Sequence, residues 1–372
     1  MYNIKTMTKI IVGLGIFVLL LVAIVLIRPP ESRILQPSDT ITPSEREAQT
    51  VSILSENLEV PWAMAFLPDG RMLVTERPGR VRLVDTNGNV SDPIATIPVH
   101  QVSESGLHGV AVDPNFETNK NIYLYYTYRS SGSNTLNRVV RYKFEGEKLL
   151  EEKIIVGQIP GAPNHDGGRI KFGPDGLLYI TTGDAQQPSL AQDRNSFAGK
   201  ILRVTRDGNR GPSNPFDTII YSYGHRNPQG ITWDDNGQLW STEHGRSPGG
   251  LDELNLIQAG KNYGWPEIQG VETRSGLITP IINSGSGDTW APAGTAYFNG
   301  SIFFAGLRGS ALYEYKISEQ KLVEHFKNEY GRLREVVLGP DGMLYVTTSN
   351  RDGRGTVRQG NDKILRINPA RL

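Results

Sequence analysis

The stretch KFGPDGLLYITTGD, residues 171–184, decides the fold, because the same pattern returns along the chain. An apolar strand leads into a tight Pro-Asp-Gly turn, and a second strand with alternating apolar residues follows. Proline fixes φ in the turn and glycine accepts a positive φ, so the pattern predicts a β-hairpin. Two further clear copies are AFLPDGRMLVTE at 65–76 and VLGPDGMLYVTTSN at 337–350.

Looser copies bring the number of repeats to six. They are AVDPNFETNKNIYLYY at 111–126, TWDDNGQLWSTEHG at 232–245 and AYFNGSIFFAG at 296–306. Further strand-like runs lie between the copies, namely RVRLVD, RVVRYKF, KILRVT, ALYEYKI and KILRIN. A spacing of about 40 to 60 residues is typical of four-stranded propeller blades with insertions. A two-sheet sandwich, the alternative all-β fold, would not produce six copies.

We therefore predict an all-β fold, a six-bladed β-propeller of four-stranded antiparallel blades over residues 51–372. We also expect the final KILRIN strand to join the first blade, because closing the ring removes exposed strand edges. The loops at one end of the central channel are then the expected place for binding groups.

The N-terminus predicts one transmembrane helix before the propeller. Lys5 and Lys9 precede an uncharged run from Ile10 to Ile27, which as a helix would span about 27 Å, close to the thickness of a bilayer core. The leading lysines predict that residues 1–9 are cytoplasmic, that 10–27 are a signal-anchor in the cell membrane, and that the rest lies on the extracytoplasmic side, periplasmic or extracellular. No small-x-small cleavage site follows, although a cleaved signal peptide and a secreted protein remain the alternative.

Residues 28–50 are rich in proline, serine, threonine and charged residues and predict a linker. The whole chain of 372 residues has 39 basic and 39 acidic residues and a net charge of zero. No overall field favours nucleic acid, so we expect no nucleic-acid partner. The absence of cysteine excludes disulfides, thiolate catalysis and cysteine-ligated zinc. A charged ligand must therefore be recognised by a local cluster.

Two loops that lead into strands carry candidate catalytic groups. In Asn164-His165-Asp166-Gly167-Gly168 the histidine lies among polar and glycine residues and could act as a general base, with Asn164 or Asp166 orienting its ring. In the second loop, SYGHRNPQG, Arg226 and Asn227 offer donors for a carboxylate or a quinone oxygen. A surface histidine and an arginine packed on tyrosine remain the alternatives.

Arginines elsewhere in the chain add positive charge. Arg308 lies in GLRGS, and Arg332 and Arg334 lie in GRLRE. Residues two apart on a strand share one face, so Arg332 and Arg334 could clamp one anion in the channel. A solvated basic face is the alternative.

The loop EHGRSPGGLDE at 243–253 has the composition of a calcium site. Glycines expose backbone carbonyls, and Asp252 and Glu253 add hard carboxylate oxygens, which suit Ca²⁺ better than softer metals. The spaced acidic residues of an EF-hand are missing. An ordinary polar turn remains the alternative reading.

Together, several motifs resemble the soluble quinoprotein glucose and aldose sugar dehydrogenases, the glucose/sorbosone dehydrogenase family. They are VPWAMAFLPDG, GLHGVAVDPNF, NHDGGRIKFGPDGLLYITTGD, SYGHRNPQG, DELNLIQAGKNYGWP and LREVVLGPDGMLYVTTSN, and the resemblance runs from about residue 50 to the end. It implies a six-bladed propeller that binds pyrroloquinoline quinone (PQQ) and calcium. It also implies oxidation of the C1 hydroxyl of an aldose to a lactone by hydride transfer to PQQ.

The resemblance also implies roles for individual residues. His165 matches the catalytic base, and the matching cofactor contacts are Glu104, Arg226, Asn227, Thr289, Arg308, Arg332 and Arg334. Arg308 stands where the family can have lysine, and Glu104 where it can have glutamine. The cofactor-bound calcium would be held by carbonyls of the Gly245–Arg246 turn. A second calcium would lie near Glu253 and the carbonyl of Tyr263.

The implied partners are an aldose substrate and an electron acceptor, a respiratory quinone or a cytochrome, which the membrane helix would keep close. Two other functions remain open at this point. One is a calcium-dependent propeller lactonase or esterase in which His165 activates water. The other is a non-catalytic, membrane-tethered carbohydrate-binding propeller.

Overall fold

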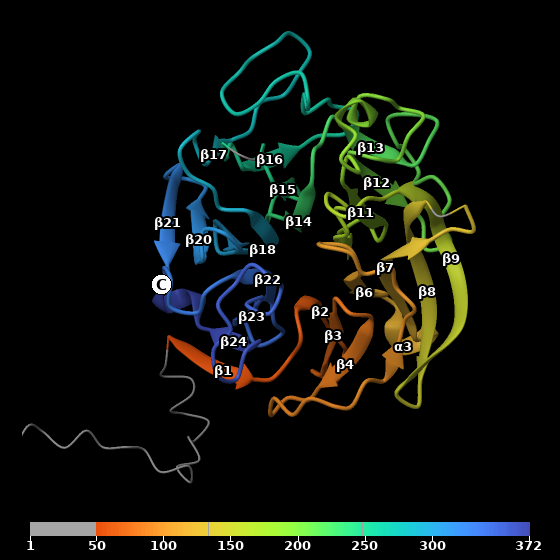
Figure 1. The fold of residues 1–372 in the computed structure, drawn as a ribbon, viewed down its shortest axis with the longest axis vertical. Helices are drawn as coiled ribbons and strands as arrows, with labels where there is room; N and C mark the ends of the chain where they lie inside the picture. Colours follow the sequence, from red (N-terminus) through yellow and green to blue (C-terminus); the bar gives the residue numbers. More distant parts are fainter. Residues whose placement is uncertain (1–49, 133, 247–248) are drawn as a thin grey trace, which may run out of the picture. The chain divides into compact units, whose positions relative to one another are not determined.

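Six four-stranded antiparallel sheets surround a common centre in the computed structural model, which describes residues 50–372 except residue 133 and residues 247–248 (Figure 1). The strand order in each sheet follows the chain outward from the centre, apart from the last blade. The predicted six-bladed propeller of four-stranded blades is confirmed.

The first three blades take up the N-terminal half of the ring. Their strands, given from the centre outward, are β2 (Pro61–Phe66), β3 (Met72–Glu76), β4 (Arg80–Val84) and β5 (Ala95–Thr96); β6 (Leu107–Val112), β7 (Asn121–Arg129), β8 (Thr135–Glu145) and β9 (Lys148–Pro160); β10 (Ile170–Phe172), β11 (Leu178–Thr182), β12 (Lys200–Val204) and β13 (Ile220–Tyr223).

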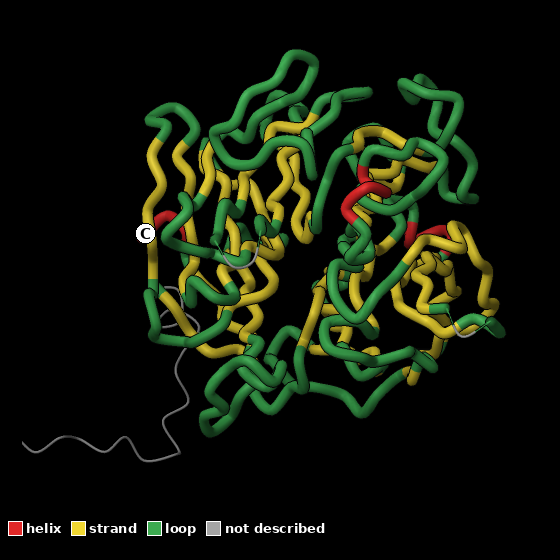
Figure 2. Tube along the Cα trace, turned by 45° about the horizontal axis from the view of Figure 1, so that its top comes forward, coloured by secondary structure: helices red, strands yellow, loops and turns green. Residues whose placement is uncertain are grey.

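The other three blades complete the ring. Their strands are β14 (Pro228–Trp233), β15 (Leu239–Glu243), β16 (Glu253–Ile257) and β17 (Ile282–Asn283); β18 (Pro292–Phe298), β19 (Ser301–Gly306), β20 (Ala311–Lys316) and β21 (Lys321–His325); β22 (Leu333–Leu338), β23 (Leu344–Thr348), β24 (Ile364–Ile367) and β1 (Val51–Ser55). Loops make up most of the chain between the strands (Figure 2). The helices of the described residues are short: α3 (Phe116–Asn119), η1 (Pro188–Ala191) and η2 (Pro369–Arg371).

Each predicted repeat forms the turn between the first and second strands of one blade. The three Pro-Asp-Gly copies place Gly70, Gly176 and Gly342 at φ angles of +86°, +73° and +74°. Glycine adopts this left-handed conformation without the steric cost that a Cβ brings. The turn chemistry seen in the sequence therefore fixes where each blade begins.

The ring is closed by the N-terminal strand and not, as expected, by the C-terminal KILRIN strand. The KILRIN segment contains β24, which is the third strand of the last blade and pairs with β23 on one side. Its other edge pairs with β1, with Val51 opposite Ile367 (Figure 1). Both edges of β24 are thus occupied, so it cannot join the first blade. The N-terminal strand completes the last blade instead and protects its edge.

The first strands of the blades lie around the centre, where β2 contacts β6 and β22, and β18 contacts β14 and β22. A buried ion pair crosses this centre, since Arg169, directly before β10, pairs with Glu335 of β22. Arg169 also donates from Nε to the carbonyl of Gln229 at 2.9 Å, and its guanidinium lies 4.3 Å from the ring centroid of Trp62. Polar and aromatic side chains therefore fill the channel at this level.

The predicted cytoplasmic segment, the transmembrane helix at 10–27 and nearly all of the linker lie outside the described residues. Within residues 50–372, again without 133 and 247–248, no helix has the length and apolar character needed to cross a membrane. The membrane anchor stays a prediction.

Glu335→Ala should destabilise the propeller strongly, because it leaves Arg169 buried without its ionic partner. We expect the free energy of unfolding to fall by about 3–5 kcal/mol. Urea denaturation measures this. Glu324→Ala is the matched control, since it breaks the exposed ion pair with Lys327 and should cost less than about 1 kcal/mol. Equal effects of the two substitutions would contradict a central role for the buried pair.

Candidate functional site

One cavity of about 500 Å³ lies where several loops enter the first strands of their blades. Nine of the twelve site residues predicted from the sequence line it: Glu104, His165, Arg226, Gly245, Arg246, Thr289, Arg308, Arg332 and Arg334. Of the other three, Glu253 and Tyr263 line a second, small cavity, and Asn227 lines neither of the two. Residues up to 250 positions apart in the chain, Glu104 and Arg354, therefore share one cavity.

His165 is oriented by a buried aspartate. Its Nδ1 lies 2.8 Å from Oδ1 of Asp184, whose side chain is fully buried. The indole Nε1 of Trp265 donates to the other oxygen of Asp184 at 2.8 Å. A carboxylate at Nδ1 keeps the proton on that nitrogen, which leaves Nε2 of His165 as the basic nitrogen. No described residue forms a hydrogen bond with this Nε2.

The expectation that Asn164 or Asp166 orients the ring was wrong. Oδ1 of Asn164 accepts from Oγ of Ser103 at 2.7 Å. Asp166 is buried, and its Oδ1 accepts from Nδ2 of Asn137 at 2.9 Å. Both side chains are turned away from the imidazole by these partners.

Asp184 was missed because it lies 19 positions after His165 in the chain. The available signal was its place at the end of the TTGD segment, directly after β11 and Gly183. A Cβ on Gly183 would lie 1.9 Å from the carbonyl oxygen of His165. Only glycine lets β11 pass this closely behind the His165 turn, and this brings Asp184 under the ring.

Arg226 and Asn227 follow each other in the chain but have different surroundings. Arg226 lines the cavity, donates from Nη1 to the carbonyl of His244 at 3.2 Å, and has a buried Nε without a partner among the described residues. Burial lowers the pKa of Arg226. Asn227 instead accepts from the backbone N–H of Gly167 at 3.0 Å, and its buried Nδ2 has no described partner. It supports the turn that presents His165.

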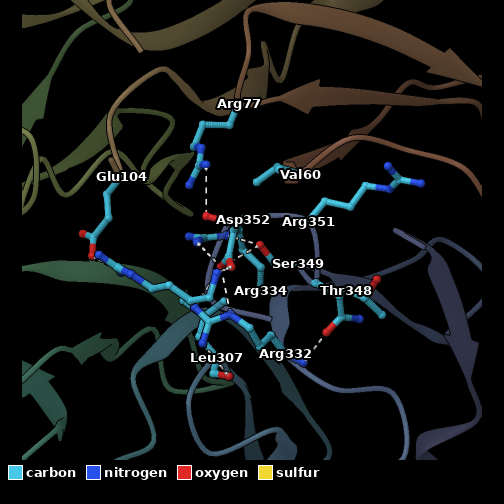
Figure 3. Close-up of polar contacts among 12 residues, drawn as sticks. Val60, Arg77, Glu104, Leu307, Arg332, Arg334, Thr348, Ser349, Arg351 and Asp352 are labelled. Carbon is cyan, nitrogen blue, oxygen red and sulfur yellow. Dashed lines mark hydrogen bonds and ion pairs between the residues drawn. The ribbon is translucent and has the colours of Figure 1, made fainter. Parts of the chain in front are cut away.

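Arg332 and Arg334 both point to the buried carboxylate of Asp352 (Figure 3), and their predicted role as a clamp for an anionic ligand stays a prediction. Nε and Nη2 of Arg332 both lie 2.8 Å from Oδ2 of Asp352, and Nη2 of Arg334 lies 3.9 Å from it. Burial lowers the pKa of Arg334 to about 9, so the group remains charged at neutral pH. Arg77 joins the group by donating to the carbonyl of Asp352 at 3.4 Å. Asp352 and Arg77 were not predicted from the sequence.

Glu104 carries a negative charge in the cavity wall. Burial alone would raise its pKa, but the charge that His244 carries at low pH and the contact with Arg354 outweigh burial and lower the pKa to about 2. Nη1 of Arg354 lies 2.5 Å from Oε1 of Glu104, and Nη2 donates to Oδ1 of Asn164 at 3.3 Å. Oε2 of Glu104 is buried without a partner among the described residues. Arg354 is a further cavity residue that the sequence did not reveal.

The cavity wall is cationic although the whole protein is neutral. Six arginines face three carboxylates in the wall; the arginines are Arg226, Arg246, Arg308, Arg332, Arg334 and Arg354, and the carboxylates are Glu104, Asp252 and Asp288. Burial lowers the pKa of His244, also in the wall, to about 4, so its ring is neutral near pH 7. An excess of three positive charges favours a ligand with several negative charges.

Asp252 is fully used in shaping the turn at Gly245. One of its oxygens accepts from the Gly245 N–H at 2.8 Å, and the other accepts from Oγ1 of Thr289 at 2.7 Å and from the N–H of Ala291 at 2.8 Å. A Cβ on Gly245 would lie 2.3 Å from the carbonyl oxygen of Leu251, so the close approach requires glycine. The carbonyls of Gly245 and Arg246 accept no hydrogen bond from a described residue and are available to a cation.

A second, very small cavity of about 10 Å³ lies between Glu243, Glu253, Tyr263 and Gln269, which is the space that one water molecule or ion needs. Burial and then the charge of Glu243 raise the pKa of Glu253 to about 8. Oε1 of Gln269 is buried without a described partner, and the carbonyl of Tyr263 accepts no hydrogen bond from a described residue. This set of acceptors fits a hard cation.

No cluster of three or more histidine or acidic side chains that could hold a metal occurs in the described part of the chain. Candidate calcium ligands at both places are therefore mostly backbone and amide oxygens. The site thus defines a class: a six-bladed propeller with an aspartate-held histidine beside a cationic cavity.

The chain belongs to the glucose/sorbosone dehydrogenase family, whose model matches residues 58–365. Aldose sugar dehydrogenase YliI of Escherichia coli K12 is 32% identical over 82% of this chain and 91% of its own. Quinoprotein glucose dehydrogenase B of Acinetobacter calcoaceticus is 31% identical over 60% of this chain and 54% of its own. The PQQ-bound structure of aldose sugar dehydrogenase from Streptomyces coelicolor is 39% identical, with a TM-score of 0.79 over 85% of this chain and 97% of that chain. The family resemblance found in the motifs is confirmed.

Without metal, the protein should lose thermal stability as the pH rises, in part because of Glu253. Its pKa in the folded protein is about 8 against an ordinary value of 4.5. The folded state therefore holds this proton more tightly, and the stabilisation is complete below about pH 4.5 and lost as the pH rises through 8. Melting temperatures measured across this range in a chelator should fall less for Glu253→Gln, which cannot ionise.

Calcium added at pH 8 should raise the melting temperature of the wild type more than that of Glu253→Gln, because the ion replaces the proton as counter-charge. Identical pH profiles and identical calcium responses of the two proteins would contradict a cation site at Glu253.

Proposed function

We propose that this protein is a PQQ-dependent aldose sugar dehydrogenase that oxidises the anomeric C1 hydroxyl of aldoses to lactones. The observation that carries the proposal is that His165, held by Asp184, lines the same cavity as the cationic group of arginines. A base and an anion-binding wall are the two parts that such a reaction requires.

The residues present fit the cofactor. PQQ carries three carboxylates, and the cavity wall has an excess of three positive charges. Arg332 and Arg334 would hold carboxylates on one side, and Arg226 and Arg308 would reach the others or the quinone oxygens. The unpartnered Nε of Arg226 is a donor still free for this purpose. The PQQ-bound relative and the quinoprotein relative support this choice of cofactor.

When bound, PQQ supplies a two-electron acceptor for the hydride that leaves C1 of the sugar. Nε2 of His165 takes the proton of the C1 hydroxyl, while the C1–H bond breaks and the C=O bond of the lactone forms. Asp184 stabilises the resulting imidazolium because its carboxylate lies 2.8 Å from Nδ1. Arg226 lines the same cavity and would stabilise negative charge that develops there during hydride transfer.

Calcium is part of the proposal. The carbonyls of Gly245 and Arg246 would hold one ion in the wall of the cofactor cavity. Such an ion would draw electron density from the cofactor and favour hydride acceptance. Glu253, the carbonyl of Tyr263 and Gln269 would hold a second ion in the small neighbouring cavity. That ion would stabilise the loops rather than take part in chemistry.

The electrons must leave the reduced cofactor for an acceptor, which we propose to be a respiratory quinone or a cytochrome. The predicted helix at 10–27 would keep the propeller at the outer surface of the cell membrane, close to such acceptors.

Reconstitution of the apoprotein with PQQ and Ca²⁺ tests the proposal. Purified protein is given a panel of aldoses and an artificial redox dye, and dye reduction and lactone formation are followed. Sugar-dependent dye reduction is expected. Hydrolysis of lactones or esters without dye reduction would show the lactonase instead, and sugar binding without either reaction would show a binding propeller. Both of these results would overturn the proposal.

His165→Ala should lower turnover by about 10²- to 10⁴-fold, because the proton of the C1 hydroxyl loses its acceptor. The affinity for PQQ should change little, since the imidazole is not one of the groups that would bind the carboxylates of the cofactor. Steady-state dye reduction and a PQQ titration measure the two effects. Full activity of the reconstituted variant would contradict the assignment of His165 as the base.

Asp184→Asn is the companion variant. Its amide can satisfy Nε1 of Trp265 only by turning its NH₂ towards Nδ1 of His165. That contact favours the tautomer with the proton on Nε2, which cannot act as a base. We expect turnover to fall at least about tenfold with an unchanged PQQ affinity. A fall in PQQ affinity alone would contradict this role of Asp184.

A further inference from the structure

Asp352 uses both of its carboxylate oxygens, and each serves a different part of the cavity. The residue lies in the loop between β23 and β24, and its side chain is 2% exposed. Oδ2 accepts two bonds from Arg332, both 2.8 Å long, and one of 3.3 Å from Oγ of Ser349. Oδ1 accepts from the backbone N–H of Arg354 at 2.9 Å.

Oδ2 of Asp352 lies among the positive charges of several arginines. Arg77, Arg332 and Arg334 all surround Asp352 (Figure 3). Three buried guanidinium groups at this spacing repel one another in a low dielectric. The charge of Asp352 offsets this repulsion, and its two short contacts fix the plane of the Arg332 guanidinium. Burial would raise the pKa of Asp352, but Arg332 and Arg334 outweigh it, so the carboxylate is ionised.

The second oxygen shapes the cavity mouth. Its bond to the N–H two residues later closes an Asx-turn. This turn presents the side chain of Arg354, which reaches Glu104 at 2.5 Å and Asn164 at 3.3 Å. Asn164 is the residue directly before His165. The bridge thus joins the loop between β23 and β24 of the last blade to the loops that lead into the second and third blades.

We infer that Asp352 is a positioning residue with two simultaneous roles. It orients Arg332 and Arg334, the arginines that would hold the cofactor, and it positions Arg354, which forms the bridge beside the catalytic histidine. The inference rests on the proposed function, since it assigns one side of the cavity to the cofactor and the mouth to the sugar. Asp352 does not itself line the cavity. Its effect on the reaction therefore passes through Arg332 and Arg354.

Asp352→Asn separates this role from simple burial, because an amide has the same shape and only one acceptor oxygen. In one orientation the NH₂ faces the fork of Arg332, and in the other it faces the N–H of Arg354. One of the two branches must fail in either case. A buried NH₂ group that faces another donor, either Arg332 or the N–H of Arg354, has no acceptor, and the lost hydrogen bond is costly.

The experiment is a titration of apoprotein with PQQ at saturating Ca²⁺, followed by tryptophan fluorescence, and a sugar titration at saturating PQQ. Asp352→Asn should raise the Kd for PQQ at least about tenfold, or raise the KM for the sugar several-fold, or both. Arg354→Gln removes only the bridge, so it should raise the sugar KM.

Arg351→Gln is the matched control. It removes one arginine from the same loop, but this side chain bonds the carbonyl of Asn361 at 2.7 Å and does not line the cavity. Both constants should equal those of the wild type. An Asp352→Asn protein with the same Kd and KM as the control overturns the inference, even if its melting temperature is lower.

If Asp352→Asn does not fold, two milder variants test the branches separately. Ser349→Ala takes away the hydroxyl that lies 3.3 Å from both Asp352 and Nε of Arg334, and should raise the Kd for PQQ. Arg354→Gln should raise the sugar KM. Unchanged constants in both variants overturn the inference. A wild type that binds no PQQ would instead refute the proposed function, so the two failures are distinguishable.

Discussion

Six arginines in the wall of one cavity repel each other, and this repulsion is the constraint that the other residues of the site satisfy. Asp352 offsets the charges of the innermost arginines, and Glu104 offsets that of Arg354 at the mouth. Asp252 lies in the wall but binds backbone and hydroxyl donors instead of an arginine. The compensation is incomplete, and the remaining positive charge is what an anionic cofactor would neutralise.

The propeller fold can hold many charged side chains near its centre without losing stability. Each blade has its own apolar contacts with its neighbours, so the centre of the ring need not be apolar. The centre contains the Arg169–Glu335 pair with Trp62 stacked on it, directly below the cavity residue Arg334. Gln229 connects the two levels, because its carbonyl accepts from Arg169 and its side chain accepts from Arg334 at 3.3 Å. The cavity floor is thus fixed by buried polar contacts between blades.

The blades were predicted from local sequence patterns, and nine of the 21 residues in the cavity wall were predicted from motifs and from the family resemblance. Turn residues mark each hairpin, and the ring brings the loops before the first strands to one place. The missed features depend on contacts between distant segments. The Arg354–Glu104 pair joins residues 250 positions apart. The ring is closed by β1, because β1 pairs with the edge of β24 that β23 leaves open. The partner of His165 was missed for the same reason, since Asp184 approaches only through the close passage at Gly183.

His225, near the cavity, has the contacts of a catalytic histidine but is closed to substrates. Nε2 of His225 lies 2.8 Å from Oγ of Ser222, and its Nδ1 lies 2.9 Å from Glu243, which is the arrangement of a hydrolase triad. Ser222 and His225 are fully buried, so no ester or lactone can reach the hydroxyl. Glu243 also accepts from the N–H of Arg226 and lines the small cavity beside Glu253. The three residues therefore form a rigid support between the small cavity and Arg226, and the groups that a substrate can reach are those that open onto the larger cavity.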